Sequence, residues 1–148
     1  MMINFKYWLI NIITLNLLLL DILLKKIFLT DSSREYFVFG WLKLKLAVNS
    51  GIAFGLVVNY YLIVLLYLII IPVLIFILIN QYKYKNNFNI LGLTMVIFGA
   101  LSNLIDRLFG GVVIDYIDLK YYSVFNLADV MIVFGVIMIL MKSFYRKS

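Results

Sequence analysis

The stretch LVVNYYLIVLLYLIIIPVLIFILI, residues 56–79, decides how the rest of this chain has to be interpreted, because it is long, apolar and without a single charged residue. A helix needs about 20 apolar residues to cross the roughly 30 Å hydrocarbon core of a bilayer. Backbone groups in lipid must be hydrogen-bonded within their own segment. The stretch is therefore predicted to be a membrane-spanning helix.

Three further apolar runs of this kind lie at residues 7–24, 88–105 and 127–141. Together the four runs predict an all-α membrane protein with four transmembrane helices, organised as a single domain over residues 1–148. The composition agrees, because 66% of the residues are hydrophobic and only 14% are charged, which differs strongly from soluble domains. The remaining segments, about 25–55 and 106–126, are expected on the outer side of the membrane.

The residue types exclude several kinds of chemistry. The chain has no cysteine and no histidine, so thiol and imidazole nucleophiles, disulfides and His-based zinc sites are excluded. Any acid or base catalysis then depends on the seven Asp and Glu residues. The net charge of +6 comes from basic residues scattered around apolar runs, so the expected partner is a membrane with anionic lipids rather than nucleic acid.

The basic residues also predict the orientation. Four spans place both termini and the loop at 80–87 on one side, which carries no acid and whose short segments contain Lys6, Lys83, Lys85, Lys142, Arg146 and Lys147. The density of Lys and Arg in these short segments places that side, with both termini, in the cytoplasm. All the acids are then expected near the outer face.

The outer segments contain two patterns typical of β-strands. Leu42, Leu44, Leu46 and Val48 alternate with more polar or smaller residues, and residues 112–119 alternate similarly. This period of two indicates half-buried strands. We expect the two strands to form a small extracytoplasmic β-cradle, with Gly110 and Gly111 making the turn that leads into the second strand.

Two constellations have simple structural explanations beside functional ones. Asp21 and Lys25 are spaced i, i+4, which is typical of an interfacial ion pair whose lysine snorkels to water. Asn49 and Gly51 lie in NSGIAFG, residues 49–55, where an ordinary loop explains the glycines. Both pairs stay open to a role in a site.

Two further constellations lie at the ends of the last two predicted spans. Gly99, Asn103 and Arg107 share one helix face, where glycine permits close helix contact, a buried Asn joins helices, and an Arg anchors a span. In FNLAD, Asn126 followed three residues later by Asp129 resembles a capping box.

Asp115 has no such local explanation, because it interrupts an otherwise apolar strand face. With Asp129 it suggests an aspartic dyad. Two close carboxylates cannot both ionise freely, so they share a proton. The ionised member takes a proton from water as the water attacks a peptide carbonyl, and the protonated member donates to the carbonyl oxygen. Such a mechanism needs no metal and no cofactor.

The order of the motifs DILLK, NSGIAF, GALSNLIDR, VIDY and FNLAD resembles the lipoprotein signal peptidases (signal peptidase II) over essentially the whole chain. The resemblance implies four membrane helices with a small outer β-cradle, in the bacterial cytoplasmic membrane. It also implies an aspartyl endopeptidase without a cofactor, which cuts a prolipoprotein just before its diacylglyceryl-modified cysteine. We expect the protein to act as a monomer among membrane lipids.

The resemblance assigns the catalytic dyad to Asp115 and Asp129. It assigns substrate binding or site support to a second group of residues: Asp21, Lys25, Asn49, Gly51, Asn103, Arg107, Asn126 and Ala128. The chain departs from the family pattern at Ile22, Ser102 and Tyr116, where Gln, Gly and Phe are usual.

Two expectations complete the prediction. A helix start capped by Asn126 favours the ionised form of Asp129, so we expect Asp129 to be the base and Asp115 the protonated partner. The alternative function is a non-enzymatic four-span transporter or assembly factor whose acids only anchor spans. Ion-coupled transport is disfavoured, because the acids lie at the ends of spans rather than at the midplane, and no internal repeat is visible.

Overall fold

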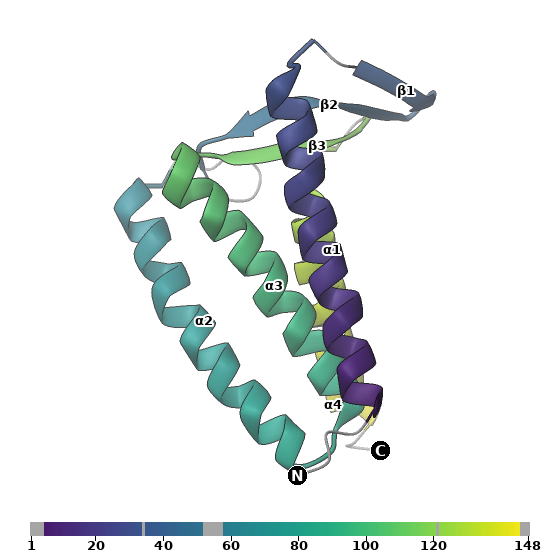
Figure 1. Ribbon diagram of the computed structural model, residues 1–148, viewed down its shortest axis with the longest axis vertical. Helices are drawn as coiled ribbons and strands as arrows, with labels where there is room; N and C mark the ends of the chain where they lie inside the picture. The colour runs from purple at the N-terminus through teal and green to yellow at the C-terminus, as the bar shows by residue number, and fades with distance from the viewer. Residues whose placement is uncertain (1–4, 34, 52–57, 121, 146–148) are drawn as a thin grey trace.

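The computed structural model describes residues 5–33, 35–51, 58–120 and 122–145. These residues form four helices and one four-stranded sheet (Figure 1). The elements in chain order are α1 (Phe5–Thr30), β1 (Glu35–Phe39), β2 (Leu42–Asn49), α2 (Tyr60–Lys83), α3 (Asn87–Gly110), β3 (Val113–Leu119), β4 (Val124–Phe125) and α4 (Leu127–Tyr145). The sheet lies across one end of the helices, and the two chain ends lie at the other.

The predicted runs 7–24, 88–105 and 127–141 lie within helices, and α2 covers residues 60–79 of the run 56–79. Two of these helices, α2 and α3, are long and apolar enough by length and composition to cross a membrane. The end of α1 and the start of α2 differ from the predicted bounds. α1 continues to Thr30, and α2 begins at Tyr60 because the side chain of Asn59 accepts hydrogen bonds from the N–H groups of Tyr61 and Leu62.

The two membrane-span candidates differ in their surroundings. Of the span residues in α2 only 11% are buried, against 67% in α3. α3 is the central helix and contacts α1, α2 and α4, whereas α2 exposes most of its apolar side chains to its surroundings. An apolar exposed surface of this size suits lipid and not water. A core cluster formed by Ile71, Ile97, Ala100 and Leu104 joins α2 to α3.

Glycines bring α3 and α4 into backbone contact. A Cβ atom on Gly99 would lie only 2.5 Å from the carbonyl oxygen of Ala128, and one on Gly135 would lie 2.5 Å from the carbonyl oxygen of Gly92. Such close approach through small residues is typical of helix pairs in membranes. The predicted role of Gly99 is confirmed, and the contact fixes the first turn of α4 against α3.

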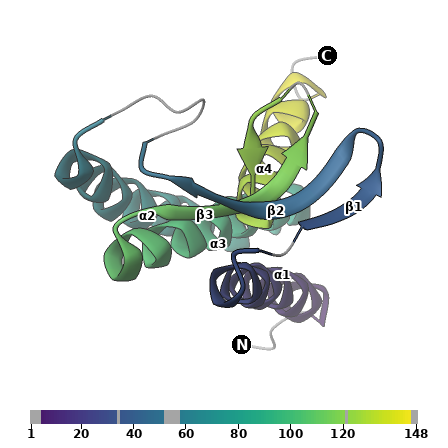
Figure 2. The ribbon, with the colours of Figure 1, turned by 90° about the horizontal axis from the view of Figure 1, so that it is seen from above.

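The sheet is antiparallel with strand order β1-β2-β3-β4. Ala47 of β2 lies opposite Asp115 of β3, and an irregularity in the pairing falls between Leu44 and Ala47. Seen from above, β2 and β3 run side by side across the ends of the helices, with β1 on the edge away from α2 (Figure 2). The sheet therefore holds Asp115 in a central strand over the helix ends.

The two predicted strands are confirmed, and so is the turn before the second. Gly111 has a φ of 73°, in the left-handed region, and its N–H bonds to the carbonyl of Arg107 as the helix ends. Strands β1 and β4 lay outside the prediction. In β1 every residue is exposed, so no alternation of polar and apolar residues marks it, and β4 has only two residues.

We predict that Gly99→Ala destabilises the protein by about 1–3 kcal/mol, because the new methyl group would overlap the backbone of α4. Equilibrium unfolding in detergent micelles measures the change. Gly40→Ala is the matched control, since a Cβ there meets no atom within 4 Å. Equal stability of the two variants would contradict the proposed tight contact between α3 and α4.

Candidate active site

The first turn of α4 holds Asp129 in a reciprocal capping arrangement. The N–H of Asp129 donates to Asn126 Oδ1 at 2.8 Å, and the N–H of Asn126 donates to Asp129 Oδ2 at 3.3 Å. This is the geometry of a capping box, with Asp in place of the usual Glu or Gln. The predicted cap is therefore confirmed. Asn126 is completely buried, so the helix start is fixed inside the protein.

The same asparagine reaches the second acid. Asn126 Nδ2 donates to Asp115 Oδ1 at 2.8 Å, and it also lies 3.1 Å from Asn103 Oδ1 and 3.3 Å from the carbonyl oxygen of Ile114. The side-chain oxygen of Asn126 accepts a hydrogen bond from the helix that carries Asp129, and its side-chain nitrogen donates one to Asp115 on the strand. The two acids therefore share one buried neighbour, although they come from different elements.

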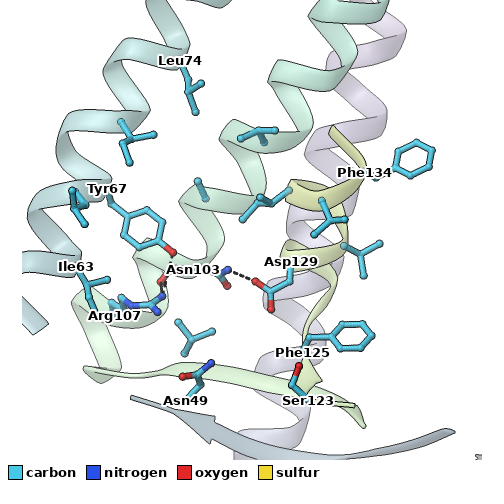
Figure 3. A pocket seen from close by; sticks show the side chains of 18 of the residues that line it. Asn49, Ile63, Tyr67, Leu74, Asn103, Arg107, Ser123, Phe125, Asp129 and Phe134 are labelled. Atoms are coloured by element: carbon cyan, nitrogen blue, oxygen red, sulfur yellow. Dashed lines mark hydrogen bonds between the residues drawn. The ribbon is translucent and has the colours of Figure 1, made fainter. Parts of the chain in front are cut away.

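Two further asparagines bind the remaining carboxylate oxygens. Asn103 Nδ2 donates to Asp129 Oδ1 at 2.8 Å, as Figure 3 shows, and Asn49 Nδ2 donates to Asp115 Oδ2 at 3.2 Å. Asp115 is buried, with 2% of its surface exposed, and Asp129 is half-buried. Hydrogen bonds thus orient both carboxylates, and one of the two remains accessible.

The pKa of Asp115 is raised. Burial raises it to about 6, and the negative charge of Asp129 adds to the rise. The amides of Asn49 and Asn126 and the charge of Lys25 act in the opposite direction. The raised pKa means that burial favours the protonated form of the Asp115 carboxyl.

Lys25 lies at the centre of a buried charged cluster. Its ammonium is 2.8 Å from Asp21 Oδ2 and 2.9 Å from Asp106 Oδ2, and it donates to Ser102 Oγ and Asn103 Oδ1 at 3.1 Å each. The predicted i, i+4 ion pair is present, but the interpretation of Lys25 as a snorkelling residue is wrong, because only 2% of it is exposed. The two carboxylates satisfy the ammonium inside the protein, as a buried charge requires.

Asp21 joins this cluster to the start of α4. It is completely buried, and its Oδ1 accepts the N–H of Ala128 at 3.2 Å and the hydroxyl of Tyr116 at 2.9 Å. Ala128 is also completely buried, so a larger side chain has no room there. These contacts bring two predicted supporting residues, Asp21 and Ala128, together beside the predicted dyad.

Arg107 anchors the loop that follows β2. Its Nη2 donates to the carbonyl oxygen of Gly51 at 2.8 Å, and Gly51 in turn donates its N–H to Asn49 Oδ1 at 3.0 Å. The guanidinium also lies 5.3 Å from the ring centre of Tyr67. The simpler reading of Arg107 as a span anchor does not fit its 5% exposure. Residues 52–57, which include the second half of the predicted motif NSGIAF, lie outside the described residues.

A groove of about 850 Å³ runs beside these residues, between α2, α3 and α4 (Figure 3). Its polar end carries Asn49, Asn103, Arg107, Ser123 and Asp129, and its length is lined by apolar side chains such as Ile70, Leu74 and Ile137. Among the described residues that line the groove, Asp129 is present and Asp115 is not. A bound molecule would thus meet Asp129 first, with Asp115 behind it.

Sequence reasoning missed three contributors to the site. Asp106 received no role in the motif GALSNLIDR, yet it binds Lys25 and accepts the N–H of Ile114 at 3.1 Å. Ser102 entered only as a departure from the family pattern, and Tyr67 lies in a uniformly apolar run that gives no signal for a single tyrosine. The only sequence signal for these residues was the i, i+4 spacing of Ser102 and Asp106, which places both on one face of α3.

The fold is helical with a small antiparallel sheet, and two of its helices are long and apolar enough to cross a membrane. Comparisons with known proteins identify its family. The family profile described as Signal peptidase (SPase) II matches residues 13–145, so the chain belongs to this family. A bacterial membrane enzyme solved by the in meso method at 2.3 Å resolution has a TM-score of 0.85 and 27% identity, covering 96% of this chain and 89% of that one. A second such enzyme, at 1.9 Å resolution, has a TM-score of 0.78 and 28% identity, covering 92% and 90%.

Related sequences carry the name lipoprotein signal peptidase. The one from Maridesulfovibrio salexigens is 35% identical over 97% of this chain and 99% of its own length, and the one from Aquifex aeolicus is 35% identical over 95% and 88%. The relative from Moorella thermoacetica is 40% identical, but the match spans only 62% of this chain and 61% of that relative. Several relatives therefore match over less than two thirds of their length.

We predict that Asn49→Ala raises the pKa of Asp115 above about 6, because the lost amide donor stabilises the ionised carboxylate. Carboxyl ¹³C titration in detergent micelles measures this pKa. The pKa of Asp115 in the folded protein is higher than in the unfolded chain. Protonated Asp115 therefore adds to the free energy of unfolding below the unfolded pKa, and this contribution is lost as the pH rises through about 6. Asn16→Ala, at an exposed site, is the control and should leave the pKa unchanged. A lowered or unmoved pKa in Asn49→Ala would contradict this hydrogen-bond role.

Proposed function

We propose that this chain is an aspartic endopeptidase that removes the signal peptide from lipid-modified prolipoproteins, cutting before the lipidated cysteine. The observation that carries the proposal is the position of Asn126, which hydrogen-bonds Asp115 on one side and the backbone and helix start of Asp129 on the other. Membership of the signal peptidase II family and the names of the relatives support it.

In the proposed reaction, Asp129 is the base and Asp115 is the acid. The carboxylate of Asp129, accessible in the groove, takes a proton from a water molecule as the water oxygen bonds to the scissile carbonyl carbon. Asp115 donates its proton to the carbonyl oxygen, giving a tetrahedral diol. When the C–N bond breaks, the leaving amine takes the proton from Asp129, and the diol returns a proton to Asp115.

Eight further residues are proposed to support the site. Asn49, Asn103 and Asn126 orient the two carboxylates through the hydrogen bonds described above. Lys25, held by Asp21, places its ammonium near the dyad and donates to the amide oxygen of Asn103. Arg107 holds the backbone of Gly51 just after β2, and Ala128 leaves room for the close contact between α3 and α4.

The groove suits a lipid-anchored substrate. Its apolar length between α2, α3 and α4 can accept acyl chains or an apolar signal-peptide segment, while its polar end presents Asp129 to the peptide bond. Because α2 is mostly exposed and apolar, the substrate can reach the groove sideways from the bilayer. The proposed partners are therefore a prolipoprotein and membrane lipids, and one copy of the chain holds the whole site.

We further propose that all four helices cross the bacterial cytoplasmic membrane as one domain, with both termini in the cytoplasm and the sheet at the outer face. α1 has 26 residues and α4 has 19, which correspond to about 39 and 28 Å of helix. Both lengths are close to the roughly 30 Å of hydrocarbon that a span must cross. Many side chains on both helices are apolar and exposed, as lipid contact requires.

A non-enzymatic transporter or assembly factor is not favoured. In that class the acids would anchor separate spans, whereas here Asp21, Asp115 and Asp129 converge from three elements on the start of α4. The relatives named above are peptidases by name.

We predict that Asp115→Asn and Asp129→Asn each lower the cleavage rate of a lipidated precursor by on the order of 10²–10⁴-fold, because each removes a proton-transferring group. Mass spectrometry of a synthetic diacylglyceryl precursor with purified protein measures the rate, with thermal unfolding to verify the fold. Glu35→Gln, in an exposed pair with Lys43, is the control and should cleave normally. Near-normal cleavage by either Asp variant would overturn the aspartic mechanism.

We predict that Ser33→Cys is labelled from outside the cell by an impermeant maleimide and that Lys83→Cys is labelled only after the membrane is opened. Ser33 follows the end of α1 and Lys83 is the last residue of α2, at opposite ends of the helices, and the natural chain has no cysteine to interfere. Labelling of intact spheroplasts measures both. Reversed labelling would show that the proposed orientation is wrong, and labelling of both positions from outside would contradict the crossing of α1 or α2.

A further inference from the structure

The start of α4 is held by side chains from three places in the chain. The first backbone N–H groups of a helix have no partner within the helix. Here Leu127 N–H donates to the hydroxyl oxygen of Tyr116 at 3.1 Å, Ala128 N–H donates to Asp21 Oδ1 at 3.2 Å, and Asp129 N–H donates to Asn126 Oδ1 at 2.8 Å. The position of the first turn, and of the Asp129 carboxylate on it, thus depends on Tyr116 and Asp21 as well as on the cap.

Asp21 is bound by two hydroxyl groups in addition to a cation and a backbone amide. Tyr116 donates to Oδ1 at 2.9 Å, beside the amide of Ala128, and Ser102 donates to Oδ2 at 2.5 Å, beside the ammonium of Lys25. Four donors thus satisfy the two oxygens of a completely buried carboxylate. The hydroxyls come from β3 and α3, so they tie these elements to α1.

Tyr116 also connects the elements that carry the two acids. It follows Asp115 in β3, it is 2% exposed, and its ring stacks on Phe28 of α1 at 5.6 Å between ring centres. Its hydroxyl donates to Asp21 and accepts from Leu127, so one oxygen bridges α1 and the start of α4. Burial and the charge of Asp21 raise the pKa of Tyr116, so the hydroxyl keeps the proton that it donates.

We propose that Tyr116 and Ser102 are positioning residues, whose hydroxyls fix Asp21 and thereby set the placement of Asp129 against Asp115. This proposal rests on the proposed peptidase function. The two hydroxyls bind opposite oxygens of the same buried carboxylate, so each of them fixes one side of Asp21.

Tyr116→Phe tests the first hydroxyl, because it removes one oxygen and keeps the ring on Phe28. We expect kcat for the lipidated precursor to fall by about tenfold and KM to change by less than about twofold, because small misplacements of reacting groups slow the chemical step more than binding. The charged groups acting on Asp115 are Asp129 and Lys25. If Asp129 is held less tightly, Asp115 is less buried and less strongly repelled by the charge of Asp129. The pKa of Asp115 should then fall, and the decline of the cleavage rate at high pH should begin at a lower pH.

Ser102→Ala tests the second hydroxyl, and the double variant tests whether the two act through Asp21. We expect a smaller loss of kcat in Ser102→Ala, because Lys25 still binds the same oxygen, and a double-variant loss below the product of the two single losses. Tyr122→Phe, at an exposed tyrosine in the loop after β3, is the control and should match the wild type. Thermal unfolding in micelles identifies any variant that fails to fold, in which case the other single variant supplies the test.

Different outcomes test the peptidase function and the positioning role of the two hydroxyls. A wild-type protein that cleaves no lipidated precursor would overturn the peptidase function. Unchanged kcat together with an unshifted pKa of Asp115, measured by ¹³C titration, in both folded single variants would overturn the positioning role. A loss of kcat with the expected downward pKa shift in Tyr116→Phe, absent in Tyr122→Phe, supports it.

Discussion

The hydrogen bonds of Asn126 are the interaction on which the rest of this structure depends. This buried side chain caps α4 through its oxygen and binds Asp115 through its nitrogen, so one amide relates a helix start to a central strand. These hydrogen bonds form only if α4 begins at the level of the sheet and β3 crosses the ends of the helices. They also require α3 to lie close enough for Asn103 to contact Asn126. Gly99 permits the close contact of α3 with α4, and the left-handed turn at Gly111 leads the chain from α3 into β3.

Burial of charge is the second constraint, because ionised groups away from water need complete sets of partners. Lys25 has two carboxylates and two neutral oxygens, and Asp21 has four donors. These groups lie behind the proposed dyad and away from the open groove, where they hold α1, α3 and α4 together at one level. The same low-dielectric surroundings raise the pKa of Asp115. Structural stability and proton affinity therefore have one physical origin in this site.

Much of this arrangement was predictable where the signal is local. The helices follow from uninterrupted apolar runs, the strands β2 and β3 from a period of two, and the cap from the spacing of Asn126 and Asp129. Lys25 was misjudged, because the sequence around it looks the same whether its ammonium turns to water or to Asp106, which lies 81 positions later. β1 escaped prediction, because all of its residues are exposed and show no alternation of polar and apolar side chains.

The sequence by itself determined that this chain has long apolar runs that form helices, that its acids lie at or outside the ends of these runs, and that it contains neither cysteine nor histidine. Composition, length of apolar runs and residue spacing are properties of the chain alone, so they can be assessed without coordinates. Only the tertiary structure decided that Tyr116 and Ser102 bind one carboxylate, that Arg107 holds Gly51, and that Asp129 faces the groove while Asp115 lies behind it. Such contacts join residues far apart in the chain, and their geometry depends on how closely α3 and α4 pack.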